Sequence, residues 1–443
     1  MPPGVLTPDS SGTTTPTTAS ASALTRAGIK HEEKQDNQPG RGRLDAARLT
    51  VQLTSTPRPV PAVGSPEEAS QAVCSDHMVT CAWTAEHGWD APALRPYGPL
   101  EMMPTASALQ YATTCFEGTK LYRGVDGRLR LFRPDRNCRR LRDSAARIAL
   151  PTPDPDEVEK LIRALCARDG PRWLPRDRVG HFMYLRPTIV ATEVALGVQR
   201  PRAALLYVVL ACFPDLSCST APNAPPALDG HAPPNNTSGT PTGLRLLASD
   251  EDTVRAWPGG FGHAKVGANY GPTLVAQGEA RARGYDQVLW LFGREGFVTE
   301  AGASNLFVVW RAADGSGRIE LVTAPLERMI LEGVTRASVL ELARTRLPPS
   351  ASGDEPGVEV VERRFTMREV VAARDEGRLL EAFAAGTAFF IAPVRSIHFR
   401  GDELELDVAR ARLAGLMRKW LSEIMYGETA HEWGVVVEEE GSS

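Results

Sequence analysis

A single lysine lies within a glycine-rich stretch of the chain, GGFGHAKVGANYGP, residues 259–272. Glycine lets the backbone approach another group closely, so Lys265 is a phosphate clamp, a covalent anchor or an ordinary loop residue. A nucleotide-binding P-loop is not indicated, because Val266 follows Lys265 where a Ser or Thr would be needed to hold magnesium. Tyr270 follows in the same stretch and is the first candidate for a partner of the lysine.

As a covalent anchor, Lys265 would form an imine with an aldehyde. A free lysine amine has a pKa of about 10.4 and becomes nucleophilic in apolar surroundings. Pyridoxal phosphate is such an aldehyde, and it needs an acid at its ring nitrogen, a donor at its phenolic oxygen and a phosphate cradle. Glu300, Tyr270 and the start of a helix at Thr335 are candidates for these roles. The ordinary alternatives are a turn residue, a core or surface residue and a helix N-cap.

The segments around these residues predict a mixed α/β (α+β) fold. The dipeptide Asp126-Gly127 indicates a hairpin over 120–132. A basic helix is expected over 133–151, and its charges are typical of a solvated face. Further elements are expected as a buried strand at 203–213, a helix at 271–284, strands at 286–292, 297–302 and 305–310, and a helix opening at Thr335.

Composition divides the chain of 443 residues into segments. Ser, Thr and Pro dominate the N-terminus, which predicts a disordered extension. A stretch rich in Pro, Ala, Asn and Gly predicts an interdomain linker. The expected division is an extension at 1–43, a first domain at 44–213, the linker at 214–243, a second domain at 244–427 and a frayed acidic tail at 428–443.

Charge, hydropathy and cysteine usage exclude several classes of function. A net charge of -4 does not favour nucleic-acid binding, and no apolar run reaches the roughly 18 residues that span a bilayer. Seven cysteines without a C-x-x-C pair indicate free thiols, and no histidine pattern indicates a metal site. The free thiols predict a cytoplasmic location. A mitochondrial location is the alternative, although the first cation of the chain is Arg26.

Six segments together resemble the branched-chain amino acid aminotransferases, in their eukaryotic form. This family belongs to fold type IV of the pyridoxal phosphate enzymes. The resemblance extends over about residues 44–425. The segments are ALQYATTCFEGTKLYRGVDGRLRLFRPDRNCRRLRDSAARIALP, MYLRPTIVATEVALGV, GGFGHAKVGANYGPTLVAQGEARARGYDQVLWLF, VTEAGASNLF, LEGVTRASVLELA and GTAFFIAPV.

The resemblance implies a cofactor, pyridoxal 5′-phosphate, and the residues that hold it. Lys265 would bind the cofactor and move a proton, Tyr270 would contact its phenolic oxygen and Glu300 its ring nitrogen. The phosphate would be held by Arg140, Val334, Thr335 and Thr387.

The resemblance also implies a small substrate-side first domain, a large cofactor-binding second domain and a homodimer whose pockets the neighbouring subunit completes. The substrates would be L-glutamate or 2-oxoglutarate and an aliphatic amino or 2-oxo acid, with Arg186 accepting the distal carboxylate of glutamate. The other substrate contacts would be Tyr111, Tyr184, Val198 and Ala388.

Other functions remain open at this point. Cys74, in place of a pocket phenylalanine, and a long linker suggest a larger aliphatic 2-oxo acid in secondary metabolism. A D-amino-acid transaminase or an aminodeoxychorismate lyase shares the fold, but YLRPT and FEGTKLYRG argue against both. A catalytically silent pyridoxal phosphate-binding protein is disfavoured because Lys265, Tyr270, Glu300 and Arg140 are all present.

Overall fold

The computed structural model describes residues 42–213, 243–348, 357–388 and 390–440. Most of the predicted extension and linker therefore lies outside the described residues. At the edge of the extension, Gly42 forms an isolated bridge with Gly88.

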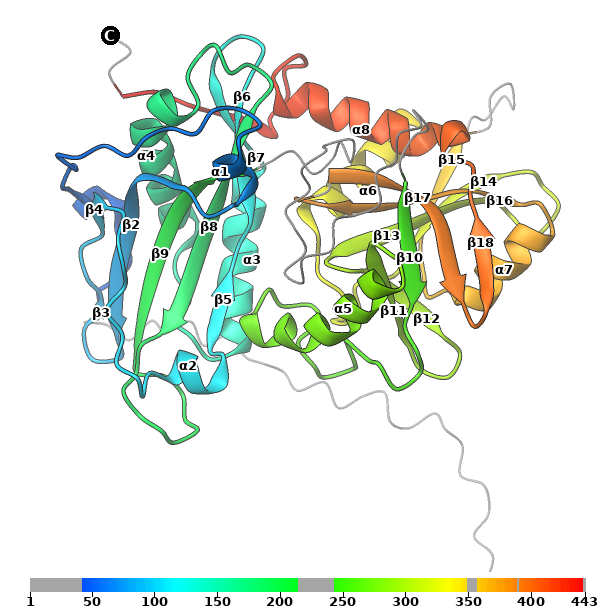
Figure 1. Cartoon of the computed structure of the whole chain (residues 1–443), viewed down its shortest axis with the longest axis horizontal. Coiled ribbons are helices and arrows are strands. Elements are labelled where there is room, and N and C mark those ends of the chain that lie inside the picture. Colours follow the sequence, from blue (N-terminus) through cyan, green and yellow to red (C-terminus); the bar gives the residue numbers. More distant parts are fainter. Residues whose placement is uncertain (1–41, 214–242, 349–356, 389, 441–443) are drawn as a thin grey trace, which may run out of the picture. The chain divides into compact units, whose positions relative to one another are not determined.

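A largely antiparallel sheet of ten strands, counted over the described residues, contains the first half of the chain (Figure 1). Its order is β1-β4-β2-β9-β8-β6-β7-β19, with β3 beside β2 and β5 beside β8. The predicted hairpin is β6–β7, and Gly127 adopts a φ of 73° in its turn, as that turn requires. The strands are β1 Thr50–Val51, β2 Cys74–Thr84, β3 Gly88–Trp89, β4 Ala93–Pro96, β5 Thr114–Phe116, β6 Thr119–Arg123, β7 Leu129–Phe132, β8 Phe182–Ala191, β9 Ala203–Cys212 and β19 Gly434–Val437.

Two long helices, α3 Pro134–Arg147 and α4 Pro155–Trp173, pack on this sheet. Each begins with a proline in its first turn, where the missing N–H costs nothing, and Asp154 caps α4 by accepting from the N–H of Asp156. Leucines of α4 and of the strands form one apolar core between the layers. The short helices α1 Pro66–Ala69 and α2 Ser107–Tyr111 lie outside this core.

A second sheet of nine strands, again within the described residues, contains most of the chain after residue 243. Strand β12 pairs with both β11 and β13, so β12, β11, β10, β17, β16 and β13 close a ring. The strands are β10 Leu244–Ala248, β11 Gln287–Phe292, β12 Phe297–Ala301, β13 Ser304–Arg311, β14 Ile319–Thr323, β15 Val358–Glu362, β16 Leu379–Gly386, β17 Phe390–Phe399 and β18 Asp402–Glu405. The helices are α5 Leu274–Ala282, α6 Val334–Arg346, α7 Met367–Asp375 and α8 Arg412–Met425.

The end of the chain returns to the first sheet, which corrects the predicted frayed tail at 428–443. After α8, strand β19 pairs antiparallel with β7, and the carboxylate of Glu439 accepts from Nη1 of Arg123 at 2.6 Å. Trp433 is buried against Phe132. The edge of β7 is therefore covered by the last described residues.

Nowhere in the described part of the chain is a helix both long and apolar enough to cross a membrane. Within the same residues, no group of three or more His, Cys, Asp or Glu side chains is arranged to hold a metal ion.

Candidate active site

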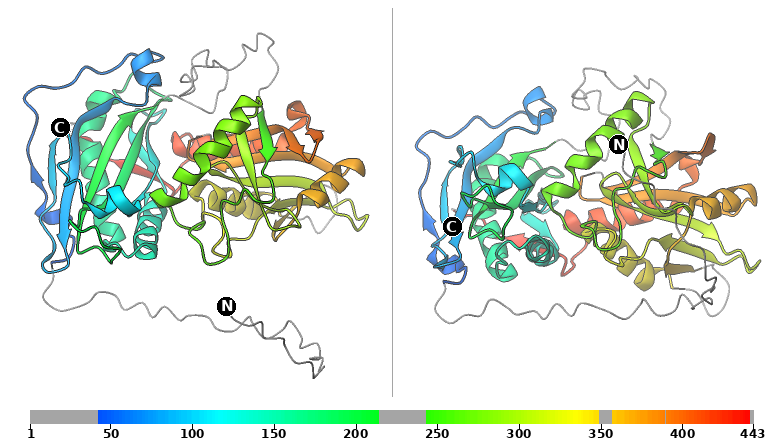
Figure 2. Two further views of the ribbon diagram at one scale, coloured as in Figure 1. Left: turned by 60° about the horizontal axis from the view of Figure 1, so that its bottom comes forward. Right: turned by 90° about the horizontal axis from the view of Figure 1, so that it is seen from below.

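The backbone of Lys265 is fixed by two elements of the first sheet's layer. Its N–H donates to Oγ of Ser144 on α3 at 2.9 Å, and its carbonyl accepts from the N–H of Phe116 on β5 at 3.0 Å. Val266 forms a bridge with Cys115 of the same strand. Figure 2 shows α3 and the segment before α5 from two further directions. The lysine is therefore held against α3 and β5 through main-chain contacts.

The glycines around Lys265 allow protein backbone to pack closely. A Cβ at Gly262 would lie 1.9 Å from the carbonyl oxygen of Met329, and one at Gly267 would lie 2.6 Å from Cγ2 of Thr114. Such distances leave no room for a side chain. Gly262 therefore packs against the loop before α6, and Gly267 packs against the start of β5.

The amine of Lys265 lies beside aromatic groups. Its Nζ is 3.2 Å from Oη of Tyr270, 4.9 Å from the ring centroid of Phe116 and 5.3 Å from that of Tyr270. No ion pair joins this amine to a carboxylate within the described residues. The structure thus brings Lys265 and Tyr270 together and leaves the amine available for chemistry.

Glu300 lies on β12 and is fully buried beside an arginine that sequence reasoning missed. Arg255 donates from Nη1 to Oε2 of Glu300, and Asn305 donates to Oε1 at 3.4 Å. Burial raises the pKa of Glu300, although the charges of Arg255 and Lys265 and a hydrogen bond from the Leu331 backbone oppose the rise. Arg255 precedes the glycine-rich stretch, but nothing in its spacing marks it as a partner of Glu300.

Arg140 on α3 has a side chain that is 10% exposed, and it pairs with a second residue that sequence reasoning missed. Its Nε and Nη2 donate to the two carboxylate oxygens of Glu117 at 2.7 and 2.8 Å, and its Nη1 donates to the carbonyl of Glu332 at 2.9 Å. The prediction that α3 presents a solvated charged face is therefore wrong at Arg140. The fork geometry of a guanidinium matches a carboxylate in this way.

Glu117 receives more donors than Arg140 alone supplies. Asn137 donates to its Oε2 at 2.7 Å. Burial by itself would raise the pKa of Glu117, but the hydrogen bonds and charge of Arg140 and the charge of Lys265 outweigh it and hold this pKa below its usual range. Glu117 is therefore a buried carboxylate between Arg140 and the lysine. The only sequence signal for it was its place in the segment CFEG.

Two residues of the predicted phosphate cradle, Val334 and Thr335, lie at the beginning of α6. Gly333 is the N-cap and has no side chain to satisfy the first amides, so Thr335 is a helical residue and not the cap. Val334, Thr335 and Thr387 line one small cavity, which Asn137 also lines. Amide donors and a helix N-terminus are a favourable environment for an anion. Ala388 follows Thr387 in the turn between β16 and β17.

Tyr184 and Arg186 lie on β8 near the lysine. The guanidinium carbon of Arg186 is 4.8 Å from the Phe116 ring centroid and 5.2 Å from that of Tyr184. The Nε of Arg186 is buried without a hydrogen-bond partner among the described residues. Tyr184 stacks on Phe213, with ring centroids 4.8 Å apart. This arrangement presents an unneutralised cation between two aromatic rings.

Tyr111 and Val198 are placed elsewhere, on the outside of the first sheet's layer. Their exposed fractions are 39% and 85%. Tyr111 donates from Oη to the carbonyl of Leu196, so the two residues lie near one another. Within the described residues, no hydrogen bond or ring contact joins either of them to Lys265, Tyr184 or Arg186. Their own chain does not bring them to the lysine.

Comparison with known proteins identifies the class. Residues 114–397 match the amino-transferase class IV family. The mitochondrial branched-chain-amino-acid aminotransferase of Schizosaccharomyces pombe is 40% identical over 82% of this chain and 78% of its own length. The cytosolic enzyme of that name from Saccharomyces cerevisiae is 40% identical over 89% of this chain and 98% of its own length.

A solved structure shares the fold. The branched-chain amino acid aminotransferase of Thermobaculum terrenum, crystallised in its PLP form, superposes with a TM-score of 0.57 over 81% of this chain and 98% of that chain, at 23% identity. The chain belongs to the class IV aminotransferases. Within that class it belongs to the branched-chain-amino-acid aminotransferases, and pyridoxal 5′-phosphate is its cofactor. The predicted family, fold class and cofactor are confirmed.

Proposed function

We propose that this chain exchanges an amino group reversibly between L-glutamate and a branched-chain 2-oxo acid. Glutamate is proposed as the amino donor because of Arg186. Its Nε is buried without a partner among the described residues, and its guanidinium lies beside the rings of Phe116 and Tyr184. Arg186 is half-buried, and a cation with a buried, unpaired nitrogen is stabilised when an anion pairs with it. The aromatic walls around it suit an aliphatic side chain, so one pocket serves both substrates.

The polar groups of the site match the functional groups of pyridoxal 5′-phosphate. The fit consists of a primary amine on Lys265, a hydroxyl on Tyr270, a buried carboxylate on Glu300 and an uncapped helix N-terminus at Val334. Arg140, Thr335 and Thr387 complete the proposed phosphate contacts. When bound, the cofactor supplies the aldehyde that receives the amino group and an electron-withdrawing ring.

The chain's own residues then have distinct tasks. Lys265 Nζ has no carboxylate partner in the described structure, so this amine would accept the proton from the substrate Cα and would later give it back. The hydroxyl of Tyr270 accepts from that amine at 3.2 Å, and its own O–H would donate to the phenolic oxygen of the cofactor. Arg255 fixes the carboxylate of Glu300, which would contact the ring nitrogen of the cofactor, so this carboxylate keeps one orientation.

The role of Lys265 is tested by chemical trapping. Borohydride reduction of the holoenzyme, followed by peptide mapping, is expected to place the cofactor mass on the peptide that contains Lys265. Lys265→Ala is expected to carry no label and to show no transamination. A label on any other peptide would contradict the assignment.

The role of Arg186 is tested by substrate preference. Arg186→Met is expected to lower kcat/KM for 2-oxoglutarate about 100-fold, because hydrogen bonds to a charged group contribute about 1.5–3 kcal/mol. The kcat/KM for 4-methyl-2-oxopentanoate is expected to change less than about threefold, since that substrate has no distal carboxylate. Arg95→Met, in β4 of the same sheet, is the matched control. Equal losses for both substrates in Arg186→Met would refute the proposal.

A substrate panel separates this proposal from a preference for larger aliphatic acids. The wild-type enzyme is expected to prefer 4-methyl-2-oxopentanoate to 2-oxooctanoate. The reverse preference would favour the larger pocket suggested by Cys74, which is buried at the start of β2.

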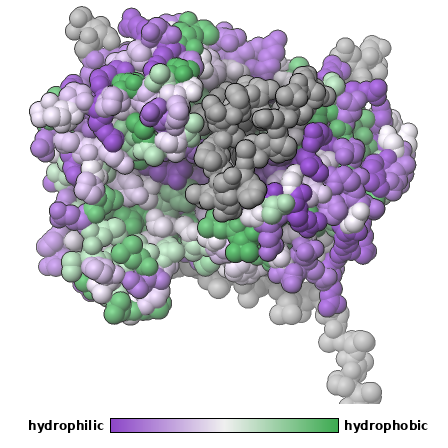
Figure 3. Space-filling model, in the orientation of Figure 1, coloured by the Kyte–Doolittle hydropathy of each residue, from purple (hydrophilic) through white to green (hydrophobic). Residues whose placement is uncertain are grey.

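We also propose a homodimer in which Tyr111 and Val198 complete the partner's site. Exposed apolar side chains gather near them, and Figure 3 shows hydrophobic residues over α2 and the loop after β8, and again over α5. The exposed residues are Leu109, Tyr111, Val194, Leu196, Val198, Leu274 and Val275. Apolar surface of this kind is typical of a protein interface.

Subunit mixing tests this arrangement. Lys265→Ala and Tyr111→Ala chains are each expected to have low activity. Mixed dimers regain one intact site if Tyr111 acts across the interface, because that site takes Lys265 from one chain and Tyr111 from the other. No recovery after confirmed exchange of subunits would show that Tyr111 acts within its own chain or not at all.

Two further proposals concern organisation and location. The two sheets support a small domain at 44–213, with β19 added, and a large domain at 244–427. Limited proteolysis within 214–243 would release two fragments if this division is correct.

The relatives include both cytosolic and mitochondrial enzymes, and we propose that this protein is located in the cytosol. Cell fractionation decides between the two.

A further inference from the structure

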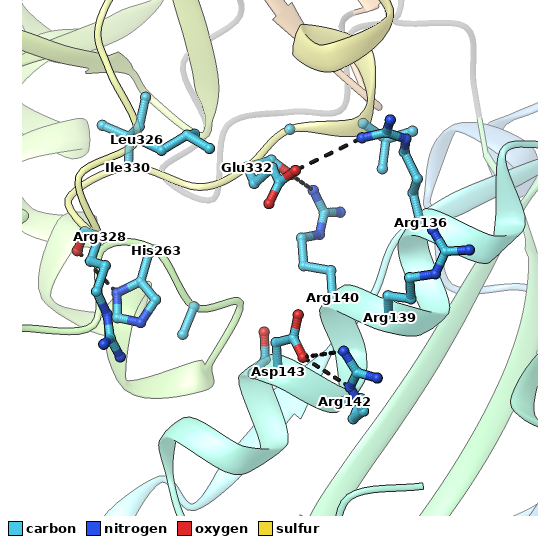
Figure 4. Close-up of a pocket in the computed structure, with 14 residues that line it drawn as sticks. Arg136, Arg139, Arg140, Arg142, Asp143, His263, Leu326, Arg328, Ile330 and Glu332 are labelled. Carbon is cyan, nitrogen blue, oxygen red and sulfur yellow. Dashed lines mark hydrogen bonds and ion pairs between the residues drawn. The ribbon is translucent and has the colours of Figure 1, made fainter. Parts of the chain in front are cut away.

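A second cavity lies between α3 and the loop that precedes α6, and His263 and Ala264 also line it (Figure 4). Its volume is about 330 Å³. Arginines dominate its lining, and the apolar side chains of Leu326 and Ile330 form part of the wall. The charged lining residues are Arg136, Arg139, Arg140, Arg142 and Arg328, against Asp143 and Glu332. The cavity therefore has an excess of positive charge.

This positive charge is only partly neutralised. Arg142 pairs with Asp143 at 2.9 Å, Arg139 with Asp135 at 3.1 Å and Arg140 with Glu117 at 2.7 Å. Arg136 comes no closer than 3.8 Å to Glu332 and 3.9 Å to Glu341. The guanidinium of Arg328 has no hydrogen bond or ion pair within the described residues. His263 adds no charge at neutral pH, because burial and the cations Arg328 and Arg147 lower its pKa.

The backbone that presents Arg328 is strained. Glu327 and Arg328 have φ angles of 36° and 57°, in the left-handed region that favours glycine. The nitrogen Nδ1 of His263 lies 3.0 Å from the carbonyl oxygen of Arg328, which fixes the loop in this conformation. Strain of this kind persists where the surrounding structure holds it, and it gathers at functional sites. An arginine side chain at a strained backbone position indicates that the location of its guanidinium group is important for function.

We propose that this cavity binds a phosphate-bearing organic anion of about the size of a nucleotide. A planar guanidinium group binds two phosphate oxygens at once, and Arg136, Arg140 and Arg328 line one space here. Leu326 and Ile330 supply an apolar surface for the organic part of the ligand. The volume falls at the lower end of the roughly 300–1,000 Å³ range of small-molecule sites.

The cavity shares residues with the catalytic centre. His263 and Ala264 line it and directly precede Lys265, and Ser144 lines it and accepts the N–H of Lys265. Arg140 reaches the cavity on one side and holds Glu117 on the other. An anion here competes with Glu117 for Arg140. The bound anion therefore lowers the affinity of the protein for the cofactor. By thermodynamic reciprocity, the bound cofactor lowers the affinity for the anion by the same factor.

Arg140 and Val334 belong both to this cavity and to the proposed phosphate cradle of the cofactor. The proposal is therefore tested by calorimetric titration of the holoenzyme with ATP, because in that form the cofactor already occupies the cradle. Saturable binding is expected at low ionic strength, and its affinity is expected to fall as salt is added. Adenosine, which lacks phosphates, is expected not to bind.

Arg328→Gly separates a ligand-binding role from a structural one. It is expected to weaken ATP binding about tenfold or more, because one charge-assisted contact is lost. It is also expected to raise Tm, because glycine adopts the positive φ without strain. A residue with only a structural role would not give these opposite signs.

Two further variants complete the design. Arg294→Ala removes an exposed arginine from the turn between β11 and β12 and is expected to leave ATP affinity unchanged. Arg186→Met is expected to retain ATP binding, since the anion does not occupy the substrate pocket. The absence of saturable binding, an unchanged affinity in Arg328→Gly or a lost affinity in Arg186→Met would each overturn the proposal. None of these outcomes depends on which 2-oxo acid the enzyme prefers.

Discussion

At the scale of single residues, Glu117 organises the centre without being a predicted site residue. It is buried, holds both Nε and Nη2 of Arg140, and lies near enough to Lys265 for that charge to lower its pKa. Removing one partner of a buried ion pair leaves the other charge uncompensated, which costs several kcal/mol. The arginine would then no longer be held in place beside the proposed phosphate site.

Glu117→Gln is therefore expected to destabilise the protein by roughly 2–4 kcal/mol, since the amide keeps some hydrogen bonds but no charge. The dissociation constant of the cofactor is expected to rise about tenfold, the cost of roughly one such hydrogen bond. Urea denaturation of the apoprotein and titration with the cofactor measure the two effects. Glu438→Gln, which breaks an exposed pair with Arg128, is the control and is expected to change little.

The same substitution changes the response to acid. Because the folded-state pKa of Glu117 is lowered, its contribution is present above the ordinary value of 4.5 and is lost as the pH falls below that value. The wild-type protein is thus expected to lose stability more steeply below about pH 4.5 than Glu117→Gln. Parallel curves for the two proteins would show that folding does not lower the pKa of Glu117.

The sequence predicted only part of this centre, and the reason is physical. Lys265 and Tyr270 belong to one short stretch, so their proximity follows from local chain geometry. Arg255 and Glu117 act through contacts with residues far away in the chain, Glu300 and Arg140, and no local pattern encodes those contacts.

At the scale of elements, the glycines of the chain separate into two kinds. Gly262 faces the carbonyl of Met329 with no room for a Cβ, whereas Gly278 lies in α5 with open space around it. The first kind permits close packing of the Lys265 loop. The second only lowers the stability of a helix.

Alanine at these two positions is expected to have opposite effects. Gly278→Ala should stabilise the protein by about 0.5–1 kcal/mol, the helix propensity difference. Gly262→Ala should destabilise it by about 1–3 kcal/mol, as overpacking does, and should lower kcat because the backbone of Lys265 shifts. Thermal denaturation and steady-state kinetics measure both. A neutral Gly262→Ala would mean that the loop before α6 moves aside without cost.

Most elements were predictable because their patterns are local. The hairpin β6–β7, helix α3 and the strand β11 follow from a turn dipeptide, helix-boundary residues and an apolar run. Strand β19 was missed, because GVVV is short, acidic residues follow it and its stability comes from pairing with β7. Pairing partners far apart in the chain cannot be read from the short strand alone.

Strand β19 gives a prediction of its own. A chain ending at Gly427 is expected to lose at least about 3 kcal/mol of stability, because buried Trp433 is removed and Arg123 loses the carboxylate of Glu439. It should also aggregate through the exposed edge of β7. A chain ending at Glu440 keeps these contacts and is the control. Equal stability of the two truncated chains would show that β19 is dispensable.

At the scale of the whole molecule, the reactivity of the cysteine thiols measures how tightly the first sheet and its helices α3 and α4 are packed. Cys74, Cys81, Cys115, Cys138, Cys166 and Cys212 are all buried and unpaired, which leaves Cys218 outside the described residues. Burial raises the pKa of Cys81 to about 12 and that of Cys212 to about 11. Since the thiolate is the reactive form, these groups are unreactive while the protein is folded.

A Cys218→Ser variant is therefore expected to show almost no reaction with Ellman's reagent in its native state and six reactive thiols in denaturant. The native reaction should proceed only through opening of the fold, so its rate should rise with urea in parallel with unfolding. The six thiols then act as probes of one cooperative unit. Rapid modification of any one of them, located by peptide mapping, would show that the layer opens locally and that its core is less cohesive than the packing of Leu121, Leu141 and Leu165 indicates.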